Sequence, residues 1–231
     1  HDDNYFEERA MKSVRVWDLP TRLFHWMLAI SVVAMFITGN LESEGALAWH
    51  FRIGYFIASL LLFRLVWGFV GGYWSRFANF RWSLVGFRLA VRNGLQEPPH
   101  LGHGYAGSWA VLGLLLVLIA QVATGLFSDN DISMAGPLSH LLDGDLVGTI
   151  TGIHKEVTKL GVLLMVALHV VAIGFYALKR RQNLVPAMVK GDQATDTPSP
   201  PSADGAPQRL FGLAVWGACA LAVWSLVTYF G

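Results

Sequence analysis

Histidines in long apolar stretches are the residues of this 231-residue chain that could do chemistry. His154 and His169 share one such stretch, from Thr151 to Leu178. On a helix their spacing separates them by about 22 Å along the axis and roughly 60° around it. An ionisable side chain is costly inside a membrane and usually meets a partner or a cofactor there. The stretch therefore presents two imidazoles to one interior at two depths.

The composition indicates a polytopic membrane protein. Hydrophobic residues make up 54% of the chain and charged residues 14%, a balance that excludes an ordinary soluble domain. Five stretches each hold close to the about 20 apolar residues that a helix needs to cross the hydrocarbon core. They run from about Leu19 to Thr38, Trp49 to Val70, Ser108 to Phe127, Thr151 to Leu178 and Leu210 to Phe230. We expect lipid around them and no nucleic-acid partner.

These stretches predict an all-α membrane protein, a four-helix transmembrane bundle over residues 11–190 followed by a fifth transmembrane helix over 209–231. Residues 191–208 are rich in Pro, Ser, Ala and Asp and predict a disordered linker. Residues 1–10 are polar and precede Met11, so we interpret them as an extension or a remnant of expression.

The loops at the two ends of this bundle differ in charge, and we name the ends accordingly. The loops of the basic end carry Lys12, Arg15, Arg22, Arg76, Arg81, Arg88, Arg92, Lys179, Arg180, Arg181 and Lys190. The loops of the acidic end carry Glu42, Glu44, Asp129, Asp131, Asp143 and Asp145. The positive-inside rule predicts a bacterial inner-membrane protein with a cytoplasmic basic end and N-terminus, and a periplasmic C-terminus.

Alternating helix directions sort four histidines into two pairs. His25 and His169 fall toward the basic end, and we call them the basic-end pair; His50 and His154 form the acidic-end pair. Two helices supply each pair, as bis-imidazole ligation of a haem requires. We therefore predict two haems b. Because Cys219 is the single cysteine and no CxxCH motif exists, these haems would be held non-covalently, and Cys219 is expected to pack a helix.

Haem propionates need cations or polar donors. Arg22 and Arg64 are candidates at the basic end, and Arg52 and Lys155 at the acidic end, although Arg22 and Lys155 can instead snorkel to the interface. Gly54, one turn after His50, either relieves crowding against a porphyrin or packs a helix.

Other candidates are weaker. His100, His103 and His140 are expected in loops, with His103 the one to place near a haem or quinone edge. Thr-Gly pairs end the first and third stretches, Thr38-Gly39 and Thr124-Gly125. Small residues allow close approach of a helix or a flat cofactor, and from the pairs alone we favour ordinary packing.

The segments RLFHW, HFRIGYFIASLLLFRLVWGFVG, GSWAVLGLLLVLIAQVATGLF and NLVPAMVKG, together with the two-histidine stretch, resemble bacterial cytochrome b561. That family includes the b-type cytochrome subunit of nickel–iron hydrogenases and the related formate dehydrogenase subunit. The resemblance covers about Val14 to Gly191. It implies a four-helix bundle with two b haems on the same four histidines. The Gly102–Gly107 turn lacks the family's frequent Asn-Pro, and the fifth helix lies outside the pattern.

The main functional hypothesis is transmembrane electron transfer between a quinone and a redox partner, without a catalytic residue of the chain's own. The partner would be a periplasmic c-type cytochrome or an electron-delivering oxidoreductase subunit, and the resemblance places quinone chemistry near the basic end. The acidic loops would steer a basic partner or are merely solvated. The alternatives are a stand-alone superoxide:quinone oxidoreductase and a non-redox scaffold. The fifth helix could dock a partner, support a homodimer or anchor the tail.

Overall fold

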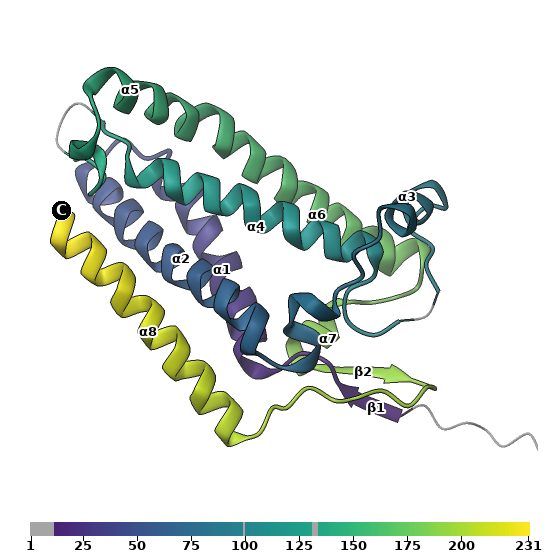
Figure 1. The fold of residues 1–231 in the computed structure, drawn as a ribbon. Helices are drawn as coiled ribbons and strands as arrows, with labels where there is room; N and C mark the ends of the chain where they lie inside the picture. Colours follow the sequence, from purple (N-terminus) through teal and green to yellow (C-terminus); the bar gives the residue numbers. More distant parts are fainter. Residues whose placement is uncertain (1–11, 99, 131–133) are drawn as a thin grey trace, which may run out of the picture.

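The computed structural model describes residues 12–98, 100–130 and 134–231, so the predicted extension at residues 1–10 lies outside the described part. Five helical spans in it are long and apolar enough to cross a membrane (Figure 1). They are α1 (Leu19–Thr38), α2 (Glu44–Val70), α4 (Tyr105–Leu126), the continuous span Gly144–Lys179, and α8 (Ala206–Phe230). This arrangement confirms an all-α, multi-pass membrane protein with a four-helix bundle and a fifth C-terminal helix.

The fourth span is not one regular helix. It consists of α5 (Gly144–Gly152), a π-helical turn (Ile153–Thr158) and α6 (Lys159–Lys179). The Asp143 side chain caps α5 by accepting a hydrogen bond from the Leu146 N–H, so the span begins before the predicted Thr151. The π-helical turn contains His154, and such turns occur often at functional sites.

Short elements gather at the basic end (Figure 1). They are α3 (Leu84–Arg92), α7 (Val185–Lys190), and the strands β1 (Lys12–Arg15) and β2 (Asp192–Thr195). The strands pair antiparallel, with Arg15 opposite Asp192.

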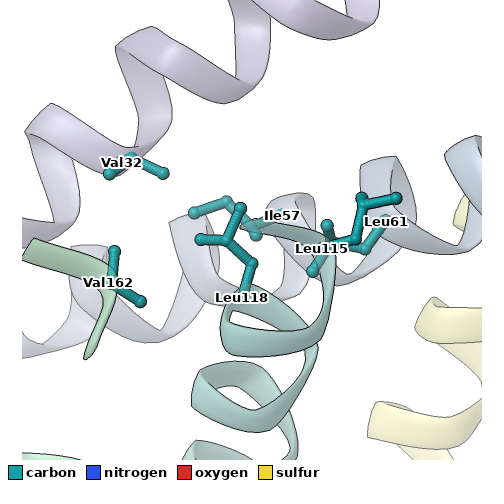
Figure 2. Close-up of a cluster of buried hydrophobic side chains, with 6 residues drawn as sticks. All are labelled: Val32, Ile57, Leu61, Leu115, Leu118 and Val162. Carbon is teal, nitrogen blue, oxygen red and sulfur yellow. The ribbon is translucent and has the colours of Figure 1, made fainter. Parts of the chain in front are cut away.

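An apolar layer fills the middle of the bundle. Figure 2 shows its six buried side chains, Val32, Ile57, Leu61, Leu115, Leu118 and Val162, which come from α1, α2, α4 and α6. Val32 lies two turns beyond His25, and Ile57 lies two turns beyond His50. The layer therefore sits between the depths of the two histidine pairs.

The fifth helix is part of the packed molecule. α8 runs along α2 on the side away from α6 (Figure 1). Cys219 of α8 is buried in one cluster with Phe24, Leu60 and Trp67, as predicted for a packing residue. At Gly212 a Cβ would come within 2.6 Å of the Pro20 ring, so glycine allows α8 to approach α1 closely.

The prediction of a disordered linker over 191–208 is wrong for much of that segment. Besides forming β2, it places Ser202 in the interior, where Ser202 donates to the Val16 carbonyl oxygen at 2.7 Å. Asp204 accepts a hydrogen bond from the Leu19 N–H and contacts Arg15 and Arg209. Burial alone would raise the pKa of Asp204, but the Arg209 and Leu19 hydrogen bonds and the charge of Arg15 hold it below its ordinary value.

A buried carboxylate joins the start of α1 to the end of α2. Asp18 is fully buried and accepts hydrogen bonds from the N–H groups of Thr21 and Gly72, at 2.8 and 3.1 Å. It also accepts from Ser75 Oγ at 2.8 Å and from Trp67 Nε1 at 3.2 Å. Charge-assisted hydrogen bonds of this kind are about twice as strong as neutral ones.

Replacing Asp18 by alanine should therefore destabilise the protein. The change leaves buried donors without their acceptor, and each costs about 1–3 kcal/mol. We expect the free energy of unfolding to fall by about 3 kcal/mol, measured by thermal or denaturant unfolding in detergent. Asp196→Ala, at an exposed position, is the control; an equal loss in both variants would contradict the role of Asp18.

Candidate haem-binding sites

The structure brings both predicted histidine pairs together. The ring centroids of His50 and His154 are 6.3 Å apart, and those of His25 and His169 are 6.2 Å apart. A metal bound to two imidazole nitrogens at about 2 Å each holds the ring centres roughly 6 Å apart. Within the described residues no hydrogen bond joins the two rings of either pair. Both separations therefore fit an iron ion between the rings.

A large cavity surrounds the acidic-end pair. Its volume is about 690 Å³, within the range of cofactor pockets, and both His50 and His154 line it. Three glycines form part of its wall: Gly54, a candidate from the sequence, and also Gly39 and Gly125. The cavity wall is mainly apolar, and the imidazoles are among its polar groups.

The Thr-Gly pair at the end of α1 contacts the His50 imidazole directly. Thr38 Oγ1 lies 3.2 Å from His50 Nδ1, and a Cβ at Gly39 would lie only 2.9 Å from His50 Cε1. The Met35 carbonyl oxygen also lies within hydrogen-bonding reach of this imidazole. The glycine thus allows the ring to lie against α1, while polar groups contact its Nδ1 side.

The Thr-Gly pair of α4 repeats these contacts at His154. Thr124 Oγ1 lies 3.2 Å from His154 Nδ1, and a Cβ at Gly125 would lie 2.9 Å from His154 Cε1. The Gln121 carbonyl oxygen is 3.0 Å from the same Nδ1. The sequence interpretation favoured ordinary packing for both pairs and missed these contacts. The shared position of the pairs, each at the acidic end of its helix, was the available signal.

Gln121 and Thr158 add a polar contact that the sequence analysis did not select. The Gln121 side-chain nitrogen lies 3.4 Å from His154 Nε2. Thr158 Oγ1, at the end of the π-helical turn, donates to Gln121 Oε1. These contacts place a side-chain amide beside one imidazole of the acidic-end pair.

The basic-end pair has different surroundings. His25 and His169 are half-buried, and neither imidazole makes a hydrogen bond among the described residues. The ring of His103, in the loop before α4, lies 4.7 Å from the rings of both Trp17 and Phe80. Its Nδ1 is buried without a hydrogen-bond partner in the part of the chain described.

The predicted cations fall in different places. Arg64 is buried, donates to the Ser75 carbonyl oxygen at 3.1 Å and lies 4.7 Å from the Phe77 ring centre. Arg22 donates to the Val189 carbonyl oxygen and lies 3.5 Å from Asp204. Protein groups therefore engage both arginines at the basic end.

At the acidic end only one of the two predicted cations reaches the cavity. Lys155 lines it, as does Lys159, which the sequence analysis did not select. Arg52 is exposed, lies over the Trp49 ring, and is not among the lining residues.

Residues 16–191 match the family model of prokaryotic cytochrome b561, which is more than half of the chain. The chain belongs to this family. It is therefore a b-type cytochrome that carries haem b and transfers electrons.

Curated relatives agree with the family. A probable Ni/Fe-hydrogenase B-type cytochrome subunit of Bradyrhizobium diazoefficiens is 24% identical over 221 residues, 80% of this chain and 89% of that protein. The protein of the same description from Cupriavidus necator is 23% identical, over 79% and 88% of the two chains. The one from Azotobacter vinelandii is 31% identical over 32% of this chain and 38% of its own. No solved structure matches significantly.

The spacing, the cavity and the small residues of this cytochrome fit haem b. Haem b supplies a one-electron iron couple, and the protein supplies ligation, orientation and electrostatics. The imidazoles of the two pairs are the side chains that would hold the iron of such a group, and the apolar layer of Figure 2 lies between them.

His103 gives the basic end of this cytochrome a pH-dependent stability. Burial, and then the positive charge of Arg64, lower the pKa of His103 to about 3. The unfolded chain, with an ordinary histidine pKa of about 6.5, takes up this proton first. Stability is therefore present above about pH 6.5 and is lost as the pH falls toward 3.

Because of His103, we expect the free energy of unfolding to fall by about 2 kcal/mol when the pH is lowered from 7.5 to 5. His103→Phe should remove that part of the loss, because phenylalanine keeps the ring contacts and cannot be protonated. The measurement is the unfolding midpoint at both pH values, with His140→Phe at an exposed loop position as control. An unchanged pH dependence in His103→Phe would rule out this role.

Proposed function

We propose that the protein conducts electrons across the membrane through two haems b, one held by His25 and His169 and the other by His50 and His154. The observation that carries the proposal is the equal separation of the two imidazole pairs, 6.2 and 6.3 Å, at opposite ends of one bundle. Either pair alone would give a single redox centre. Two pairs give a path that spans much of the bilayer.

Charge and relatedness support the choice of electron partners. The basic end is assigned to the cytoplasmic side of a bacterial inner membrane by the positive-inside rule, which leaves the acidic end in the periplasm. There, Glu42 and Glu44 border the cavity of the acidic-end pair and suit a partner with a basic docking surface. The relatives are named as hydrogenase subunits, which supports an electron-delivering oxidoreductase subunit as the partner; the acidic loops would equally suit a basic c-type cytochrome. A membrane quinone exchanges electrons at the basic end.

The first test is the haem content of the purified chain. Pyridine haemochrome spectra should give two haems b per chain, and dithionite should reduce both. One haem would show that one pair does not ligate. No haem, in protein made with ample haem supply, would leave the scaffold hypothesis and overturn the proposal.

A second test separates an electron-transfer subunit from a complete enzyme. The purified chain should be reduced by a quinol analogue, yet should not turn over superoxide and quinone without another subunit. Sustained superoxide-dependent quinone reduction by the chain alone would favour a stand-alone oxidoreductase.

A further inference from the structure

The two imidazole pairs differ in the hydrogen-bond contacts of their ring nitrogens. At the acidic end, Nδ1 of His50 lies 3.2 Å from Thr38 Oγ1, and Nδ1 of His154 lies 3.2 Å from Thr124 Oγ1. At the basic end, His25 and His169 make no hydrogen bond with any described residue. This asymmetry was not visible in the sequence, where all four positions are histidine.

The threonine hydroxyls determine which partner donates. Thr38 Oγ1 lies 2.8 Å from the Ala34 carbonyl oxygen, and Thr124 Oγ1 lies 2.8 Å from the Ala120 carbonyl oxygen. A hydroxyl has one proton, and in each threonine it is donated to that carbonyl, four residues earlier on the same helix. Each Oγ1 can then only accept, so the imidazole Nδ1–H is the donor.

Backbone carbonyls strengthen the same tautomer. The Gln121 carbonyl oxygen lies 3.0 Å from His154 Nδ1, and the Met35 carbonyl oxygen is near the His50 imidazole. With Nδ1 carrying the proton, Nε2 carries the lone pair that can bind a metal, and at His154 the Gln121 amide, 3.4 Å away, must give up its contact with this nitrogen when a metal binds. A hydrogen bond from the other ring nitrogen fixes a ligand's orientation and makes it a stronger electron donor.

Resting on the proposed function, we infer that Thr38-Gly39 and Thr124-Gly125 are positioning elements that lower the midpoint potential at the acidic-end pair below that at the basic-end pair. Stronger donation from the imidazoles stabilises the ferric state, and hydrogen bonding around the ligands is one of the protein's means of setting a haem potential. At equilibrium, a single electron in the chain then resides at the basic end.

The charges near the pairs are mixed at both ends and do not by themselves order the two potentials. At the basic end, the buried guanidinium of Arg64 interacts electrostatically with His103 and with the buried carboxylate of Asp18, which opposes its charge. A buried positive charge favours the reduced, less positive state of a nearby centre. At the acidic end, charges of both signs line the cavity, with Lys155 and Lys159 opposed by Glu42 and Glu44, so their effects partly cancel.

The test removes the threonine hydroxyls without changing side-chain shape. Wild type, Thr38→Val, Thr124→Val and the double variant are titrated spectroelectrochemically as purified full-length protein. We expect the lower of the two midpoint potentials to rise and the higher to stay fixed. In the double variant the shift should be about tenfold in the ferric–ferrous equilibrium, or about 59 mV for a one-electron couple.

Controls separate a hydrogen-bond effect from a general structural one. Thr228 of α8 makes the same contact with a carbonyl four residues earlier but lies on the fifth helix, so Thr228→Val should leave both potentials unchanged. Thr38→Ser with Thr124→Ser keeps the hydroxyls and should restore the wild-type values. His169→Ala, which keeps the acidic-end pair, should show only the lower potential.

The outcomes distinguish this inference from the proposed function. Two haems with unchanged potentials in the double valine variant, or a shift of the higher potential, would overturn the inference and leave the proposed function standing. Fewer than two bis-histidine haems in the wild type, read from the low-spin ferric spectrum, would overturn both.

Discussion

A protein in which His169 is replaced by alanine is expected to lose one haem b and keep the other. His169 faces His25 at the basic end, and removing one imidazole leaves an iron there with a single axial ligand. The apolar layer around Val32, Ile57 and Val162 lies between the two ends, so the acidic-end pair keeps its surroundings. The haem content of the purified protein should fall from two per chain to one.

The pairing of the histidines also predicts which alanine variants should share the same residual haem spectrum. His25→Ala should leave the same residual spectrum as His169→Ala, and His50→Ala should match His154→Ala. The ring planes are nearly perpendicular in the acidic-end pair, at 89°, and 58° apart in the basic-end pair. Because the relative orientation of the axial ligands affects the iron d orbitals, the two residual ferric EPR spectra should differ.

The matched control for these variants is His140→Ala, at an exposed loop position. It should retain both haems with unchanged spectra. Retention of two haems in His169→Ala would refute the ligand assignment. The pairing would be refuted if the residual spectrum of His169→Ala matched that of His50→Ala or His154→Ala and differed from that of His25→Ala.

The second large effect is expected at two glycines. In Gly39→Ala and Gly125→Ala the new methyl group would lie 2.9 Å from the Cε1 of His50 and His154, closer than carbon atoms tolerate. The His50 imidazole must move away from α1 and the His154 imidazole from α4, and each loses its Nδ1 hydrogen bonds. Disturbing such supporting contacts weakens metal binding about 10–100-fold, and we expect haem retention at the acidic end to fall in that range.

Transfer of haem to an apoglobin measures this retention. Gly217→Ala is the control, because a Cβ at this position in α8 meets no atom within 4 Å. The control should keep both haems and gain slightly in helix stability, since alanine favours a helix over glycine by up to about 1 kcal/mol. Equal haem loss in the control would show that the contact at the imidazoles is not the cause.

The sequence was sufficient for the class of protein, the five spans and the partners of each histidine. The length of an apolar run, the charge of the loops and the direction of each helix can all be taken from the sequence. Together they predict how deep in the membrane each histidine lies. His50 and His154 could be paired without knowing the distance between their helices. The start of α2 at Glu44 rather than Trp49 was missed because a polar first turn, capped by Ser43, carries no apolar signal.

Other features required the tertiary structure because they join residues far apart in the chain. The segment around Ser202 and Asp204 has the composition of a linker, yet its partners Val16, Arg15 and Leu19 precede it by more than 180 residues. In the sequence, Asp18 has only the position of a helix cap for α1. The structure adds its hydrogen bonds from Trp67 and Ser75, which are about 50 residues further along the chain.

The same holds for the support of the imidazoles. The Thr-Gly pairs of α1 and α4 contact histidines 12 and 30 residues further along the chain, counted from each threonine. The sequence by itself determined which four side chains could bind iron, because helix period and membrane depth fix their height and face. The tertiary structure alone decided that two of the four are hydrogen-bonded at Nδ1, because that contact depends on how closely neighbouring helices approach.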